Sequence, residues 1–85
     1  MTHAPTPIDR AAQAAGSNAA LAAALRVNPA LVHQWRKGRR PLAEHHCPAI
    51  EAITGVRCEE LRPDVQWLRD EAGQVTGYQV PIRAA

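Results

Sequence analysis

Apolar side chains recur at intervals of three and four residues through the first half of the chain, which predicts amphipathic helices. The clearest example lies between Ser17 and Lys37, where two short periodic segments flank a break. Ser17 and Asn28 suit helix N-caps, because their side-chain oxygens can accept an otherwise unsatisfied backbone N–H. Pro29 follows at the first helical position, where its missing N–H costs no hydrogen bond. We therefore predict two helices joined by a tight turn, over roughly 17–26 and 28–37.

The apolar positions of these two helices indicate which faces pack together. Val32 and Trp35 are three residues apart, so both are expected to point back onto the first helix of the pair. Ala22 is small enough for the second helix to cross closely over the first, and Val27 fills the corner between them. Gly38, directly after the second helix, is a typical C-terminal stop.

This combination resembles the helix-turn-helix of phage repressors and Cro proteins, whose second helix lies in the major groove of DNA. Those proteins often have glycine at the turn, where this chain has Arg26. Arg26 must either adopt a left-handed backbone, which is unfavourable for a residue other than glycine, or the turn differs slightly.

Further helices are predicted on both sides of this motif. Thr6, Pro7 and Asp9 form a capping-box start for a helix that Gly16 ends. A fourth helix is expected over 42–54, and Pro48 should kink its first turn or delay its regular start. Its expected inward residues are Leu42, Cys47, Ile50 and Ile53, and a single helical turn should follow over 58–61.

The apolar pattern changes after Val65, where two β-rich segments flank a turn cluster. We predict a hairpin with strands over 65–69 and 75–80. Because an isolated hairpin is marginally stable in water, it should pack on the helices or pair with a second chain. The expected organisation is a disordered tail (1–5), a helix-turn-helix domain (6–64), a hairpin that serves as a dimerisation element (65–82) and a final tail (83–85).

Charge is distributed unevenly along the 85 residues, although the net charge is only +2. Residues 1–42 carry six basic residues against one acidic residue, whereas residues 43–85 carry four against seven. A basic half that contains a helix-turn-helix is the electrostatic pattern of nucleic-acid binding. The acidic half should face away from phosphate. No segment resembles a signal peptide or a membrane span, so we expect a soluble cytoplasmic protein without a membrane partner.

The segment from Val32 to Trp67 is similar to the YdaS family of small prophage regulators. The residues that carry this resemblance are Trp35, Lys37-Gly38, Pro41, Ala43-Glu44, Cys47-Pro48-Ala49-Ile50-Glu51, Thr54-Gly55 and Glu60-Leu61-Arg62-Pro63-Asp64. The resemblance covers roughly residues 8–67 and implies a mostly α, five-helix Cro/repressor-like domain that binds DNA and regulates transcription. Proteins of this family are also labelled antitoxin-like and sometimes toxin-like.

In this fold, the start and outer face of the second motif helix reach base edges. We predict that bases are read by Asn28, Ala30, Leu31, His33 and Gln34. Asn and Gln can pair with adenine, and Ala and Leu can contact a thymine methyl group. Backbone N–H groups at a helix start, and cations around a helix end, favour phosphate. The predicted phosphate contacts are Ser17, Asn18, Arg36, Lys37, Arg39 and Arg40.

The expected partners are a double-stranded operator and a second copy of the chain, because one motif helix reaches only a few base pairs. The protein should then be a sequence-specific repressor that acts at its own promoter. The alternative is an antitoxin whose acidic half neutralises a co-encoded toxin, or binds a phage-regulator protein. A solvent-exposed polar helix face remains the simpler interpretation of His33 and Gln34.

The two cysteines suggest neither a disulfide scaffold nor an enzyme. His45, His46, Cys47 and Cys58 do not have the spacing of a zinc finger, and a catalytic Cys–His pair would need a pocket that so short a chain is not expected to form. We expect no cofactor and no metal. Trp35 is expected in the core rather than as a stacking platform for single-stranded bases.

Overall fold

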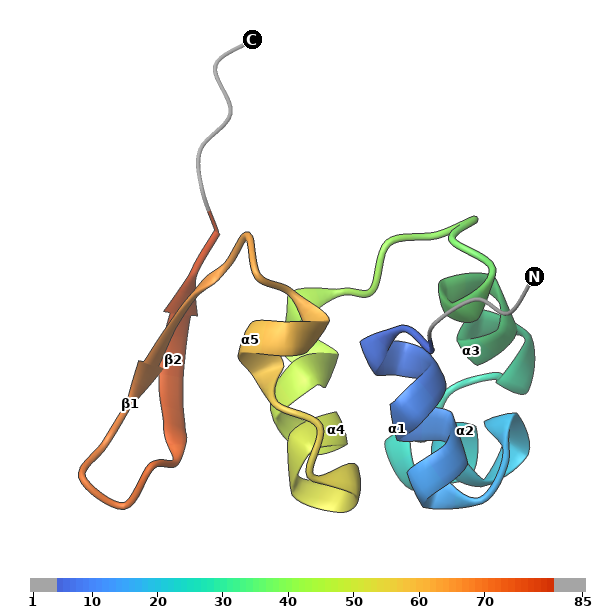
Figure 1. Ribbon diagram of the computed structural model, residues 1–85, viewed down its shortest axis with the longest axis horizontal. Helices are drawn as coiled ribbons and strands as arrows, with labels where there is room; N and C mark the ends of the chain where they lie inside the picture. The colour runs from blue at the N-terminus through green and yellow to red at the C-terminus, as the bar shows by residue number, and fades with distance from the viewer. Residues whose placement is uncertain (1–4, 81–85) are drawn as a thin grey trace, which may run out of the picture.

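The computed structural model describes residues 5–80, which form five α-helices, a single 3₁₀ turn and an antiparallel hairpin. The helices gather into one cluster, and the hairpin stands beside α4 and α5 at the end of the molecule opposite α3 (Figure 1). The terminal tails predicted at 1–5 and 83–85 lie almost entirely outside the described residues. The elements are α1 (Pro7–Ala15), α2 (Asn18–Leu25), α3 (Pro29–Arg36), η1 (Glu44–His46), α4 (Cys47–Thr54), α5 (Cys58–Leu61), β1 (Gln66–Arg69) and β2 (Val75–Gln79).

The start of α1 confirms the predicted capping box. The Thr6 hydroxyl accepts a hydrogen bond from the Asp9 backbone N–H at 3.2 Å, and the Asp9 carboxylate accepts one from the Thr6 N–H at 3.1 Å. These two bonds satisfy backbone donors that have no partner inside the helix. Gly16 ends α1 with a φ of 113°, a value that glycine adopts without the steric cost of a Cβ atom.

The core is made by the inner faces of the helices and contains no buried polar or charged residue among those described. Close packing is possible because several of its members are small, so the helix axes can approach one another. None of the helices within 5–80 has the length and apolar character needed to cross a membrane. The central cluster consists of Ile8, Ala11, Ala12, Leu21, Ala22, Val32, Trp35, Leu42, Cys47, Ile50, Val56 and Cys58.

The helix predicted over 42–54 begins later than expected. Leu42 is buried but not helical, residues 44–46 form a 3₁₀ turn, and the regular helix starts at Cys47. Pro48 explains this delay, because proline is tolerated only in the first turn of an α-helix. It therefore marks the start of α4 rather than a kink within it.

The prediction that Ile53 points inward was wrong, because its exposed fraction is 44%. The inner face of α4 follows Cys47, Ile50 and then Thr54, at helical spacing. Thr54 can face inward because its hydroxyl donates to the Ile50 carbonyl at 2.7 Å and accepts from the Val56 N–H at 3.2 Å. One hydrogen-bonded threonine thus takes the position that we had expected an isoleucine to fill.

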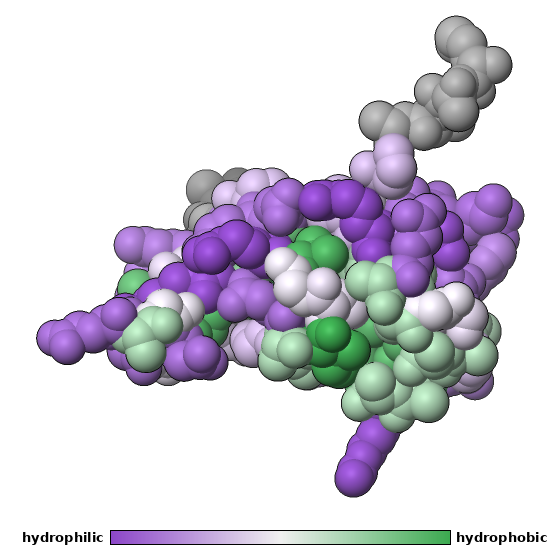
Figure 2. All heavy atoms as spheres, turned by 60° about the horizontal axis from the view of Figure 1, so that its bottom comes forward, coloured by the Kyte–Doolittle hydropathy of each residue, from purple (hydrophilic) through white to green (hydrophobic). Residues whose placement is uncertain are grey.

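On the face of the molecule that Figure 2 shows, apolar residues gather in one region, and hydrophilic residues border it. The exposed apolar residues of the helices include alanines of α1 and α2 and Ile53 of α4. The exposed alanines of α1 and α2 are Ala14, Ala19, Ala20, Ala23 and Ala24. These methyl groups carry no charge, so they offer no electrostatic attraction to phosphate.

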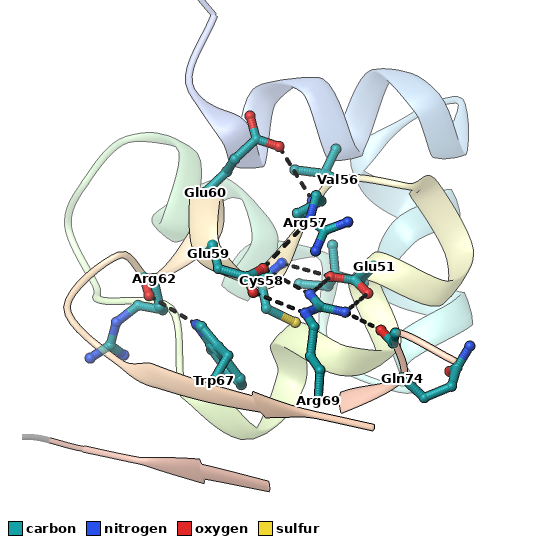
Figure 3. Close-up of polar contacts among 12 residues, drawn as sticks. Glu51, Val56, Arg57, Cys58, Glu59, Glu60, Arg62, Trp67, Arg69 and Gln74 are labelled. Carbon is teal, nitrogen blue, oxygen red and sulfur yellow. Dashed lines mark hydrogen bonds and ion pairs between the residues drawn. The ribbon is translucent and has the colours of Figure 1, made fainter. Parts of the chain in front are cut away.

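The hairpin is present as predicted, and it packs on the helices. Arg69 of β1 reaches between α4 and α5 and contacts two carboxylates, Glu51 at 2.6 Å and Glu59 at 2.7 Å (Figure 3). The Trp67 indole N–H donates to the Arg62 carbonyl at 3.1 Å, and its ring lies 5.3 Å from that of Tyr78. Hydrogen bonding to Arg69 lowers the pKa of both glutamates to about 2. An ion-pair cluster therefore holds the hairpin in place.

Candidate nucleic-acid interface

The helix-turn-helix is formed as the sequence predicts. Val32 is fully buried and Trp35 is 5% exposed, and both belong to the same core cluster as Leu21 and Ala22 of α2. Val27 is partly buried and packs against that cluster from the turn between the helices. The buried face of α3 therefore fixes which of its side chains are presented to the outside.

Of the two possibilities that the sequence left open for the turn between α2 and α3, the structure has the left-handed one. Arg26 has φ 59° and ψ 44°. Its N–H donates to the Ala23 carbonyl at 3.2 Å, and the Val27 N–H donates to the Ala22 carbonyl at 2.9 Å. This pair of bonds is the Schellman arrangement that ends many helices, usually with glycine in the left-handed position. The turn therefore has the backbone expected for a helix-turn-helix, with arginine where phage repressors often have glycine.

The predicted base-reading residues lie on α3 and at its N-terminus, and one of them, Leu31, packs against the core. Asn28, Ala30 and His33 are exposed, whereas Leu31 and Gln34 are partly buried. The Asn28 side-chain oxygen accepts the Ala30 N–H at 2.9 Å, so Asn28 is the helix cap. Only its side-chain amide nitrogen is left for an external acceptor. His33 and Gln34 make no side-chain hydrogen bond to another described residue.

The predicted phosphate contacts divide into two groups. At the start of α2, the Ser17 hydroxyl accepts the Ala20 N–H at 3.0 Å. The helix start is therefore fixed, and its first backbone N–H groups lack acceptors within the helix. At the end of α3, Lys37, Arg39 and Arg40 are exposed.

Gly38 fixes the chain direction after α3 by a second Schellman arrangement. Its φ is 72°, its N–H donates to the Trp35 carbonyl at 3.2 Å, and the Arg39 N–H donates to the Gln34 carbonyl at 3.0 Å. The loop that carries the cations is thus attached to α3 by backbone bonds.

Arg36 has an internal role that the sequence did not reveal. Its Nε donates to the Asp9 carboxylate and its Nη1 to the Asn18 side-chain oxygen, both at 2.7 Å. These bonds join α3 to α1 and α2, and the contact with Arg36 is the main reason why the pKa of Asp9 is lowered. The predicted phosphate contact of Arg36 remains a prediction, but two of its donor nitrogens are already used. Similarly, the Asn18 side chain is engaged, and only its backbone N–H remains as a candidate.

The cations of the described residues fall into two classes. Five of the nine are held by carboxylates at 2.6–3.7 Å: Arg10, Arg36, Arg57, Arg62 and Arg69. The other four are exposed and make no side-chain hydrogen bond or ion pair to a described residue: Arg26, Lys37, Arg39 and Arg40. All four lie next to one end or the other of α3. We call them the unpaired cations.

The acidic half of the chain is largely neutralised by arginines of the same protein. Of the seven acidic residues in 43–80, five are in ion pairs. Arg62 alone contacts Glu44 at 3.3 Å and Asp64 at 2.8 Å, and it donates to the Leu42 carbonyl at 2.6 Å. These carboxylates mainly stabilise the fold, so the acidic half presents less negative surface than its composition suggests.

The cysteines are core residues. Cys47 and Cys58 are both fully buried, and burial raises the pKa of each thiol to about 12. Nucleophilic and metal-binding cysteines need an accessible thiolate, which these environments disfavour. Among residues 5–80, no group of three or more His, Cys, Asp and Glu side chains is placed to hold a metal ion.

Comparison with known proteins identifies the family. The family described as "Bacterial toxin YdaS" matches residues 8–70. The protein described as "Putative transcriptional regulator YdaS", from Escherichia coli (strain K12), is 52% identical over 54 residues, which are 61% of this chain and 55% of that protein. The chain thus spans about half the length of this curated relative.

A solved structure supports the fold as well. It is the Cro protein from putative prophage element Xfaso 1 in Xylella fastidiosa strain Ann-1, which is 41% identical to this chain, with a TM-score of 0.64. The superposition covers 69% of this chain and 92% of the Cro chain. None of the three names describes an enzyme, which agrees with the prediction of a non-catalytic protein. The chain therefore belongs to the YdaS family and has a Cro-like fold, as its sequence predicted.

Proposed function

We propose that this protein is a regulator of transcription that binds double-stranded DNA sequence-specifically, with α3 in the major groove. The observation that carries this proposal is the position of the unpaired cations. Five arginines of the described chain are paired with carboxylates, whereas the unpaired cations, three arginines and one lysine, lie at the two ends of the motif helix. Cations without internal partners are available to neutralise phosphate, which supplies much of the affinity of such complexes. The names of the relatives, a transcriptional regulator and a Cro protein, point in the same direction.

In this proposal, two sets of residues have different tasks. Base edges are read by Gln34 and His33, with contributions from Asn28, Ala30 and Leu31. Phosphates are bound by the backbone at Ser17 and Asn18 and by the side chains of Lys37, Arg39 and Arg40, and Arg36 mainly positions α3 through Asp9 and Asn18. The acidic, internally paired half faces away from the duplex.

The proposed regulation is repression at the protein's own promoter in the bacterial cytoplasm, by a homodimer on two half-sites about one helical turn apart. The hairpin is the proposed dimer contact. It forms a two-stranded sheet whose outer edges are unpaired within the described chain, and β2 (Val75–Gln79) contains no charged residue. Natural proteins usually protect free sheet edges with charge or proline, so an uncharged edge suits pairing with a second copy.

The dimer contact is tested by deleting residues 65–85 and measuring the oligomeric state by analytical ultracentrifugation. We expect a folded monomer with weakened operator binding. Since the deletion also removes the packing of Trp67, the variant Leu68→Lys provides a milder test. Leu68 is 42% exposed, so a lysine there adds charge to the hairpin without emptying the core. A dimer of unchanged stability in both variants would remove the hairpin from the interface.

DNA binding is tested by selection from a pool of random duplexes, with the full chain as bait. We expect enrichment of one sequence with two related half-sites, which the protein then binds more tightly than a scrambled duplex. Recovery of no common sequence, together with equal affinity for all duplexes, would contradict the proposal.

The alternative function is that of an antitoxin that binds a co-encoded toxin, or a phage-regulator protein, through the acidic half. The name "Bacterial toxin YdaS" for the family keeps protein partners in view. Against this alternative, five of the seven acidic residues in 43–80 are already paired within the chain. Copurification from cells that express the neighbouring genes discriminates the two functions. A stable complex with a co-encoded protein, in the absence of operator binding, would favour the antitoxin.

A further inference from the structure

Arg26 is the one residue of 5–80 other than glycine that has a left-handed backbone. Among residues 5–80, positive φ values occur at five positions, and the other four are glycines: Gly16, Gly38, Gly55 and Gly73. Left-handed backbone brings Cβ close to a carbonyl oxygen, which disfavours every residue that has a Cβ atom. Arginine at φ 59° is therefore retained despite a steric cost that glycine would avoid.

The two ends of the motif provide an internal comparison. Arg26 after α2 and Gly38 after α3 occupy the same position of the same hydrogen-bonded arrangement, with donor–acceptor distances of 2.9–3.2 Å in both. Backbone geometry alone would thus favour glycine at both positions. The reason for arginine has to lie in its side chain.

Nothing within the described chain uses that side chain. Arg26 is exposed, and it makes no hydrogen bond or ion pair with another residue of 5–80. Arg36, ten residues further on, shows the contrast, because Asp9 and Asn18 hold its guanidinium. An external anion is the partner that would make a strained, unpaired arginine useful.

The position of Arg26 beside α3 indicates which anion this would be. It precedes the α3 cap Asn28 by two residues, whereas Lys37, Arg39 and Arg40 follow the other end of α3. An α-helix of eight residues is about 12 Å long, which is close to the width of the major groove of B-DNA, also about 12 Å. Unpaired cations therefore stand at both ends of a helix that matches the groove.

We infer that Arg26 binds a DNA backbone phosphate on the wall of the major groove opposite the wall bound by Arg39 and Arg40. This inference rests on the proposed DNA binding and adds a contact that anchors the N-terminal end of α3. A guanidinium so placed would bind duplexes of any sequence, since phosphates carry no base identity. Arg26 thereby sets orientation and affinity, while Gln34 and His33 set specificity.

The test is a salt titration of duplex binding by the full chain and three variants, with a short duplex of mixed sequence and the selected operator as probes. Arg26→Gly removes the charge and relieves the left-handed strain, so its melting temperature should rise. Loss of one phosphate contact should lower the salt slope by about 0.9 and the affinity by about 15-fold at 50 mM salt, but only about fourfold at 200 mM. The loss should be the same for both probes.

Two variants complete the design. Arg26→Lys keeps a point charge and should retain most of the wild-type affinity and salt slope. Arg57→Ala removes an exposed cation that is paired with Glu59, away from α3, and should leave the slope unchanged.

Three outcomes would contradict the inference: an unchanged slope in Arg26→Gly, a loss in Arg26→Lys as large as in Arg26→Gly, or an equal fall in slope for Arg57→Ala. Wild-type protein without salt-dependent duplex binding would instead refute the proposed function itself, so the two failures are distinguishable.

Discussion

Arg69 allows the most quantitative prediction, because one guanidinium joins the hairpin to two helices. Its side chain is 15% exposed and lies 2.6 Å from Glu51, whose side chain is 22% exposed, and 2.7 Å from Glu59, which is 46% exposed. The contact with Arg69 is the main reason why the pKa of Glu51 falls from 4.5 to about 2. At 1.36 kcal/mol per pKa unit this corresponds to at most about 3.4 kcal/mol, and we add nothing for the solvent-screened Glu59.

We expect Arg69→Met to lower the free energy of unfolding at pH 7 by about 2 kcal/mol, after allowance for the solvent around the pair. A carboxylate whose pKa is lowered by folding stabilises the native state above its unfolded pKa, here 4.5. That contribution is lost as the pH falls toward 2. The difference between wild type and variant should therefore shrink by more than half between pH 7 and pH 3.

The assay for Arg69 is urea unfolding at both pH values, followed by far-ultraviolet circular dichroism. Arg57→Met is the matched control, since Arg57 is 59% exposed and 3.7 Å from Glu59, so its loss should cost less than about 0.5 kcal/mol. A difference between wild type and Arg69→Met that does not change with pH would refute the reasoning. So would a cost at pH 7 no larger than that of the control.

Three further predictions concern the interface and the core. Gln34→Ala should reduce discrimination between operator and scrambled duplex, whereas Arg39→Ala should weaken both alike and lower the salt slope by about one, as measured by fluorescence anisotropy. An equal loss of specificity in both would show that base and phosphate contacts were assigned wrongly. Asp9→Asn should destabilise the protein by about 1–2 kcal/mol at pH 7 and by less at pH 3, because the pKa of Asp9 is lowered in the fold. A cost that is independent of pH would exclude the Arg36 ion pair as its cause. Cys47 and Cys58, with pKa values of about 12, should resist iodoacetamide at pH 8 until urea unfolds the chain, and rapid labelling of the native protein would contradict their burial.

Local signals in the sequence were sufficient to predict the helix-turn-helix. Caps at Thr6, Ser17 and Asn28 act within three residues of their own positions, so each can be recognised without a tertiary structure. Likewise, the spacing of Val32 and Trp35 is enough to define the buried face of α3. At Arg26 the sequence predicted a turn but left its backbone open, and the structure shows the left-handed conformation.

Contacts between distant segments could not be predicted in the same way. Arg36 and Asp9 are 27 positions apart, and Arg69 and Glu51 are 18 apart, so no periodicity links them. The sequence therefore contained no sign that Arg36 holds α1 and α2, or that most carboxylates of the acidic half are paired within the chain. The prediction of an inward Ile53 failed for a related reason, because Thr54 is partly buried through hydrogen bonds that depend on the path of the chain after α4.

The central claim, that α3 and the unpaired cations form the DNA-binding surface, is tested most directly by NMR. Amide shifts of ¹⁵N-labelled protein are followed while the selected operator is added. We predict that the largest changes map to residues 17–18 and 26–40, with small changes in α4 and its exposed Ile53. Changes concentrated in α4 and α5, with residues 26–40 unaffected, would contradict the account.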